Sequence, residues 1–149
     1  MFYSDTGSAS VEIAIKMAYQ YWKNIDAERY AKKNKFLTLH HGYHGDTIGS
    51  VSVGGIDSFH NIFKDLIFEN IQIETPCLYK SKYRNEAEML NSILNQIEDI
   101  LSEKNDEIVG LILEPLIQGA TGLFVHAHGF LKAVAQLCRK YDVFNPRLD

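Results

Sequence analysis

The chain has 149 residues, of which 46% are hydrophobic and 23% are charged, and its formal net charge is -4. That length suits a single domain, and the composition is typical of an ordinary globular protein. The sequence contains neither a lysine- and arginine-rich block nor an apolar run of the roughly 20 residues that span a bilayer, so we expect neither nucleic acid nor membrane as a partner.

The first third of the sequence predicts a turn that leads into a helix. Residues 1–3 are apolar and typical of a strand, and residues 4–8 are rich in turn formers. From Ala9 to Trp22, apolar residues recur at helical spacing over much of the circumference, which predicts a largely buried helix. We expect residues 23–35 to be a charged, solvated connection.

The rest of the sequence alternates short strands with helices. Residues 36–39 and 71–73 read as strands, and a continuous apolar run over 108–113 is typical of a buried parallel strand. Helices are predicted over 47–53, 86–101 and 130–141, with loops over 76–85 and up to Gly122. This alternation predicts an α/β fold with a mainly parallel sheet, whose ligands bind beyond the carboxyl ends of the strands.

Glycine and hydroxyl residues at the first helix start form one candidate site. Gly7 and Ser8 open the helix, where free amides and the helix dipole favour a phosphate group. The same residues also fit a simple N-cap, in which Thr6, Ser8 or Ser10 accepts a hydrogen bond from a helix amide. The residues alone leave both interpretations open, but the absence of GxGxxG argues against a dinucleotide site.

Two further candidates follow predicted strands. In residues 42–47, Tyr43 could stack on a flat cofactor ring and His44 could donate a hydrogen bond near neutral pH. The alternative is a turn with a packed tyrosine, capped by Asp46 or Thr47. Glu114 ends the 108–113 strand, where a carboxylate is costly unless it is hydrogen-bonded or faces a cleft; alternatively, it emerges into solvent.

The cysteines and the remaining histidines suggest no metal site. Cys77 and Cys138 have neither metal nor disulfide spacing, so we expect reduced thiols and a cytoplasmic location. Cys138 is expected to pack on a helix face. For His60, His126 and His128 we expect surface or turn roles.

Taken in order, three segments resemble the signatures of class III pyridoxal-phosphate (PLP) aminotransferases. Residues 2–23 resemble the strand and helix at the cofactor phosphate, residues 42–49 the ring-stacking loop, and residues 113–120 a third signature. The resemblance runs from Met1 to about Val143. It implies part of the large PLP-binding domain of fold-type I aminotransferases: an incomplete, mainly parallel sheet with flanking helices.

The resemblance also assigns roles to residues. It implies that Gly7 and Ser8 bind the PLP phosphate, that Tyr43 stacks on the pyridine ring, and that Glu114 lies beside the cofactor. The complete set of implied cofactor-binding residues is Gly7, Ser8, Tyr43, His44, Gly45, Asp46 and Glu114.

Asp46 points to one branch of the family. An aspartate after His-Gly is typical of the biotin-synthesis branch, which implies transfer of an amino group from S-adenosylmethionine to 8-amino-7-oxononanoate in a homodimer. The rival readings are another class III aminotransferase, acting on an omega-amino acid or a diamine, and a non-catalytic phosphate-binding module.

The sequence departs from the family pattern at its end. Residues 144–149 stand where the family has a strand that ends in the aspartate of the pyridine nitrogen, and no lysine matches the family's Schiff-base lysine. We therefore expect a partial PLP-binding domain over residues 1–143, a divergent tail over 144–149, no catalytic residue and an inactive fragment.

Overall fold

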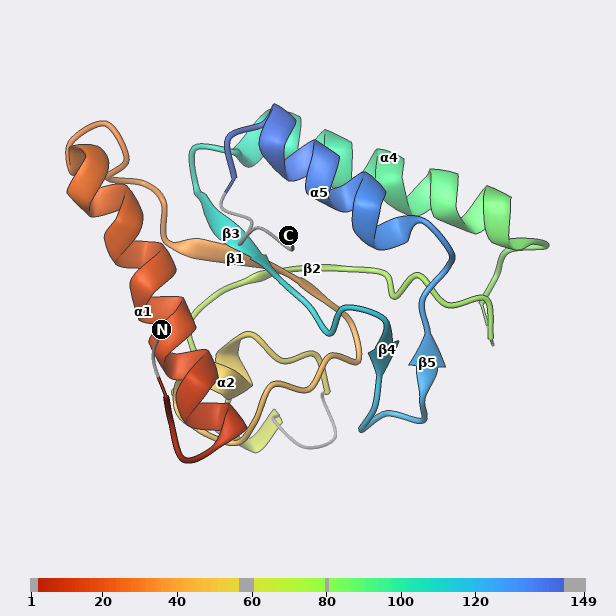
Figure 1. Cartoon of the computed structure of the whole chain (residues 1–149), viewed down its shortest axis with the longest axis horizontal. Helices are drawn as coiled ribbons and strands as arrows, with labels where there is room; N and C mark the ends of the chain where they lie inside the picture. Colours follow the sequence, from red (N-terminus) through yellow and green to blue (C-terminus); the bar gives the residue numbers. More distant parts are fainter. Residues whose placement is uncertain (1–2, 57–60, 80, 144–149) are drawn as a thin grey trace.

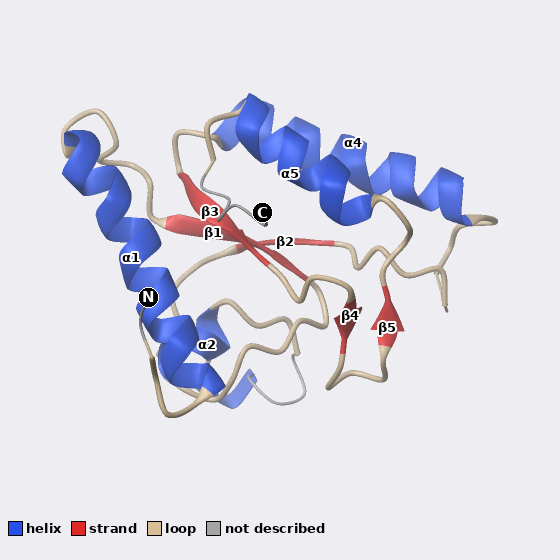
Figure 2. Cartoon of the chain, viewed as in Figure 1, coloured by secondary structure: helices blue, strands red, loops and turns tan. Residues whose placement is uncertain are grey.

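A computed structural model describes residues 3–56, 61–79 and 81–143 of the chain. Its centre is a three-stranded parallel sheet in the order β2-β1-β3, made of β1 (Lys35–Leu39), β2 (Ile71–Ile73) and β3 (Ile108–Ile112). Figures 1 and 2 show helices on both faces of this sheet. The predicted α/β architecture and the three parallel strands are confirmed.

Alternation along the central strands creates two cores. Phe36 belongs to the cluster beneath α1 (Gly7–Asp26), whereas its neighbour Leu37 belongs to the larger cluster on the opposite face. The same alternation separates Ile108 from Val109 on β3. Successive side chains of a strand point to opposite faces, so a continuous apolar run supplies both layers.

The larger core lies under α4 (Glu86–Lys104) and α5 (Phe130–Lys140). Asn85 caps α4 by accepting a hydrogen bond from the Glu88 amide at 2.9 Å. The predicted helix over 86–101 is present, and its half-buried Leu90, Leu94 and Ile100 pack against this core. Cys138 packs in this core as expected, and burial raises the pKa of its thiol to about 11. The buried α4 residues are Met89, Ile93, Ile97 and Leu101.

On the other face, α1 buries less of its surface than the sequence suggested. Only Ile15, Ala18 and Trp22 are buried, so the prediction of a largely buried helix is wrong. The helix lies against the sheet along one stripe, where its residues pack on Phe36, Val53 and Val109. Large apolar side chains on its outer side are exposed: Met17, Tyr19, Tyr21 and Ile25.

The connection after α1 is also less solvated than predicted. The helix continues to Asp26, and Lys33 is only 3% exposed. The Lys33 ammonium donates to the carbonyl oxygens of Asn105 at 2.5 Å and Ile108 at 2.7 Å, and it lies 4.3 Å from the centre of the Trp22 ring. Burial lowers its pKa, with Asp142 and Asp106 acting in the opposite direction. The carbonyls and the ring compensate the buried charge.

Short elements complete the fold at the carboxyl ends of the strands. The predicted helix at 47–53 is present as α2 (Ile48–Ser52), and a 3-10 turn, η1 (Asn61–Phe63), follows. The expected loop before Gly122 instead contains β4 (Ile117–Gln118), which pairs antiparallel with β5 (Phe124–Val125). Two-residue strands are too short to give a hydrophobic period. The predicted strand start at residues 1–2, His60 and the tail 144–149 lie outside the described residues.

No helix in the described part of the chain combines the length and apolar character needed to cross a bilayer.

Candidate functional site

The N-terminus of α1 is both capped and open to an anion. Thr6 is the N-cap: its Oγ1 accepts from the Ala9 amide at 3.2 Å, and its carbonyl accepts from the Ser10 amide at 3.1 Å. The amides of Gly7 and Ser8 precede that first intrahelical bond, so helix geometry directs them outward. Apart from its chain neighbours and its own helix backbone, no heavy atom of the described residues lies within 4 Å of a Cβ built on Gly7. The two readings of this segment are therefore compatible.

The Tyr43 loop, residues 42–47, passes directly across this helix start. The Asp46 amide donates to Ser8 Oγ at 3.2 Å, and Ser50 Oγ donates to the Ser8 carbonyl at 3.2 Å. Gly45 has φ +120°, and a Cβ there would lie 2.0 Å from Ser8 Oγ. A glycine is thus required for the loop to approach Ser8 this closely. Segments 38 residues apart in sequence are therefore in direct contact.

Tyr43 and Asp46 are linked by their side chains. The Tyr43 hydroxyl donates to Asp46 Oδ2 at 2.7 Å, and this hydrogen bond raises the pKa of Tyr43. Asp46 is therefore not a helix cap here. Thr47 occupies the N-cap position of α2 without a side-chain cap bond, and its Oγ1 donates to Ser50 Oγ at 3.0 Å.

Glu114 anchors the Tyr43 loop to the segment after β3. Its Oε1 accepts from the Tyr43 amide at 3.1 Å and its Oε2 accepts from the Gly119 amide at 2.9 Å. The alternative in which Glu114 simply emerges into solvent is wrong, because both oxygens are engaged and the residue is half-buried. Sequence reasoning missed Gln118 beside it, which is fully buried and donates from Nε2 to the His40 carbonyl at 2.9 Å.

His44 contributes a half-buried imidazole to the loop. Its Nε2 has no hydrogen-bond partner among the described residues, and it lies 3.3 Å from a Cβ built on Gly42. Burial lowers the pKa of His44, and the nearby Glu114 charge opposes that effect. Around pH 7 the ring is therefore neutral, with one nitrogen that donates and one that accepts.

His126, expected at the surface or in a turn, lies in the irregular segment between β5 and α5 but is not at the surface. The residue is half-buried, and both ring nitrogens are buried without a partner in the described part of the chain. Its ring packs edge-on against Phe130 at 5.6 Å. Burial lowers its pKa. The pairing of β5 with β4, which the sequence did not predict, brings this residue against α5.

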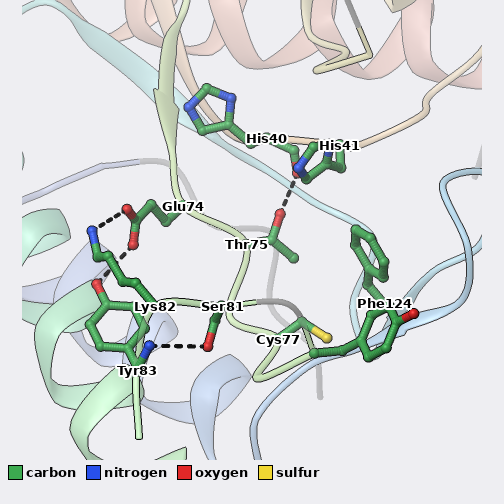
Figure 3. A pocket seen from close by; sticks show the side chains of 10 residues that line it. His40, His41, Glu74, Thr75, Cys77, Ser81, Lys82, Tyr83 and Phe124 are labelled. Atoms are coloured by element: carbon green, nitrogen blue, oxygen red, sulfur yellow. Dashed lines mark hydrogen bonds and ion pairs between the residues drawn. The ribbon is translucent and has the colours of Figure 1, made fainter.

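A separate cavity of about 430 Å³ lies beyond the ends of β1 and β2 (Figure 3). At its rim, Glu74 accepts from Lys82 Nζ at 2.6 Å and from the Tyr83 hydroxyl at 2.8 Å, which lowers the pKa of Glu74. None of the seven predicted cofactor residues lines this cavity. The described residues include no group of three or more His, Cys, Asp or Glu placed to hold a metal ion.

The donors at the helix start fit a phosphorylated aromatic molecule. The Gly7 and Ser8 amides are directed outward, and Ser8 Oγ, which accepts from Asp46, retains its proton for donation. The Tyr43 loop crosses the same helix turn and carries an aromatic ring. A phosphate bound at the amides would thus lie next to a ring that can stack.

Comparison with known proteins gives a consistent result. The family described as aminotransferase class-III matches residues 1–144. An adenosylmethionine-8-amino-7-oxononanoate aminotransferase of Staphylococcus aureus is 76% identical over 96% of this chain. The crystal structure of the enzyme of that name from Methanocaldococcus jannaschii superposes with a TM-score of 0.81 at 36% identity over 96% of the chain. An omega-aminotransferase from Paracoccus denitrificans gives 0.83 at 30% identity over 95% of the chain.

These relatives are much longer than the chain. It covers 32% of the Staphylococcus aureus protein, 29% of the Methanocaldococcus jannaschii chain and 31% of the Paracoccus denitrificans chain. The chain thus spans about a third of the length of the proteins that it matches.

Proposed function

The chain belongs to the class III aminotransferase family, and on that premise we propose that its helix start and Tyr43 loop bind PLP. Gly7 and Ser8 hold the phosphate, and Tyr43 stacks on the pyridine ring. One observation carries the proposal: the hydrogen bond from the Asp46 amide to Ser8 Oγ joins the two segments into one site.

The other implied residues hold the Tyr43 loop in place. Glu114 fixes the Tyr43 backbone, and Asp46 fixes the Tyr43 hydroxyl. Gly45 permits the close approach to Ser8, and His44 adds a neutral ring at the base of the loop. With its orientation restrained at both ends, the Tyr43 ring can serve as a fixed wall for a cofactor.

We further propose that the reaction is the one named for the similar enzymes, in which S-adenosylmethionine gives an amino group to 8-amino-7-oxononanoate in the cytoplasm, in a homodimer. PLP supplies the electron sink for such a transfer. The fold alone does not select this reaction, since it resembles omega-aminotransferases equally well. The residue that favours this branch is Asp46, which follows His44-Gly45.

Turnover by these 149 residues alone is not expected. No lysine in the chain matches the cofactor-bearing lysine of the family, and no aspartate matches the partner of the pyridine nitrogen. The chain should therefore bind PLP without exchanging amino groups. A steady release of product from S-adenosylmethionine and 8-amino-7-oxononanoate would contradict this expectation.

Equilibrium dialysis of the chain against PLP tests the binding proposal. We expect saturable binding that Ser8→Asp abolishes, because a carboxylate beside the helix amides competes with and repels the phosphate. Ser102→Asp is the matched control, since Ser102 is exposed on α4 and its hydroxyl donates to the Asp99 carbonyl. Absence of PLP uptake by the unchanged chain, or equal uptake by Ser8→Asp, would overturn the proposal.

A further inference from the structure

Glu12 connects α1 to the start of α2. Its Oε1 accepts a hydrogen bond from the Gly49 amide at 2.8 Å. A Cβ built on Gly49 would lie 2.4 Å from Glu12 Oε2 and 2.6 Å from Oε1, so the carboxylate closes over the Gly49 backbone. Only a glycine leaves room for this contact.

Glu12 lies one helical turn after Ser8, on the same side of α1. Residues four apart on a helix are neighbours on its surface. Both face the segment that follows the Tyr43 loop, because Ser50 Oγ donates to the Ser8 carbonyl at 3.2 Å while Gly49 donates to Glu12. Together with the Asp46 bond to Ser8 Oγ, these contacts fix the helix against residues 46–50.

Glu12 is the charged member of this set. The Gly49 amide stands at the first turn of α2, where backbone amides have no intrahelical partner. A hydrogen bond from such an amide to an ionised acceptor is stronger than one between neutral groups. Of the contacts that join α1 to residues 46–50, the Glu12 contact should therefore contribute most to their alignment.

We propose that Glu12 is a positioning residue, which sets the distance between the phosphate-binding amides and the Tyr43 ring. The inference rests on the proposed PLP site. In PLP the phosphate and the ring are covalently joined at a fixed separation, so both gain full contact only where the two protein segments are aligned. Two linked groups bind more tightly than either alone only when the geometry lets both occupy their sites at the same time.

This proposal makes a distinctive prediction about partial ligands. Inorganic phosphate needs only the helix amides, and pyridoxal needs only the ring wall. Loss of alignment should leave the affinity for each part nearly unchanged while it lowers the affinity for PLP. A purely structural role for Glu12 would lower all three affinities together.

The experiment compares Glu12→Ala and Glu12→Gln in the full chain by equilibrium dialysis with PLP, with pyridoxal and inorganic phosphate as competitors. For Glu12→Ala we expect PLP affinity to fall about tenfold, the scale of one charge-assisted hydrogen bond, and the two competitor constants to change less than about twofold. Glu12→Gln keeps an acceptor oxygen but not the charge, and it should recover part of the PLP affinity. Glu103→Ala, which removes an exposed carboxylate from α4, controls for net charge.

Each remaining outcome decides against the inference. Unchanged PLP binding by Glu12→Ala, or an equal loss for PLP, pyridoxal and phosphate, would show that Glu12 does not act through alignment. Failure of Glu12→Gln to recover affinity would exclude the acceptor role. If the unchanged chain takes up no PLP, the proposed function itself fails and this inference falls with it.

Discussion

The two ends of the parallel sheet differ in whether their buried polar groups have hydrogen-bond partners. At the amino end, Lys33 is buried but its ammonium has carbonyl partners, and Trp22 Nε1 donates to the Val109 carbonyl at 2.8 Å. At the carboxyl end, His44 Nε2 and Gln118 Oε1 are buried without a partner in the described part of the chain. Two residues in the left-handed region also lie there, with φ +66° at His41 and +120° at Gly45, while at the amino end Asp142, whose carbonyl accepts from Lys33, has φ +53°.

This contrast separates a stabilising region from the region proposed to bind the cofactor. Buried polar groups are normally satisfied, and exceptions together with strained backbone concentrate at binding sites. The amino end therefore holds the sheet together, while the carboxyl end retains the conformations and open polar atoms that a ligand can use. Substitutions at the amino end should act on stability, and those at the carboxyl end mainly on binding.

The largest effect is expected at the amino end, from Trp22→Ala. Trp22 is 3% exposed, packs beneath the Lys33 ammonium and donates to Val109, so its removal leaves a cavity and an unpaired carbonyl. We expect the free energy of unfolding to fall by about 3–5 kcal/mol, measured by urea denaturation. Met17→Ala, on the exposed side of the same helix, should change it by less than about 0.5 kcal/mol. Similar losses of unfolding free energy for Trp22→Ala and Met17→Ala would contradict the stabilising role of the buried side of α1.

Gly45→Ala should act mainly on binding. Its Cβ would meet Ser8 Oγ at 2.0 Å, which forces the Tyr43 loop away from the helix start, and its φ of +120° adds a strain of about 1–3 kcal/mol. We expect PLP binding to be lost in dialysis. Gly122→Ala is a matched control: its φ is +117°, but its Cβ would meet only Phe124 Cε1 at 3.6 Å. PLP binding by Gly45→Ala equal to that of Gly122→Ala would contradict the proposed site.

A pH dependence of stability is the smallest expected effect. Burial holds the pKa values of His44 and His126 below the ordinary value of 6.5. Below about pH 6.5 the unfolded chain therefore binds protons that the folded chain does not, so the free energy of unfolding falls as the pH falls. Urea denaturation between pH 7.5 and about 5.5 measures this slope. His44→Gln should flatten it, whereas His128→Gln, at an exposed position, should not. An unchanged slope in His44→Gln would contradict the prediction.

Much of the fold could be read directly from the sequence. The strands at 36–39 and 71–73, the apolar run at 108–113 and the helix at 86–101 each follow from local spacing. The candidate residues could also be named, because glycine, hydroxyl and aromatic residues follow predicted strands. That Gly45 and Ser8 touch could not be read, since their contact depends on how β1 and α1 pack.

The sequence misled where burial depended on distant partners. The sequence predicted a solvated Lys33 because its neighbours along the chain are charged. The carbonyls that accept its hydrogen bonds come from the segment before β3 and from β3 itself. His126 looked peripheral because the short pairing of β4 with β5 has no period to detect. Glu12 gave no signal at all, since a carboxylate one turn into a helix is most often solvated.

The sequence by itself determined the alternation of strands and helices and the chemical types after each strand, because these depend on residues only a few positions apart. The tertiary structure alone decided that Ser8 and Glu114 converge on the Tyr43 loop and that Lys33 is buried. Such contacts join residues tens of positions apart. They arise from the order β2-β1-β3, which brings the loop after β1 between the segments at α1 and β3.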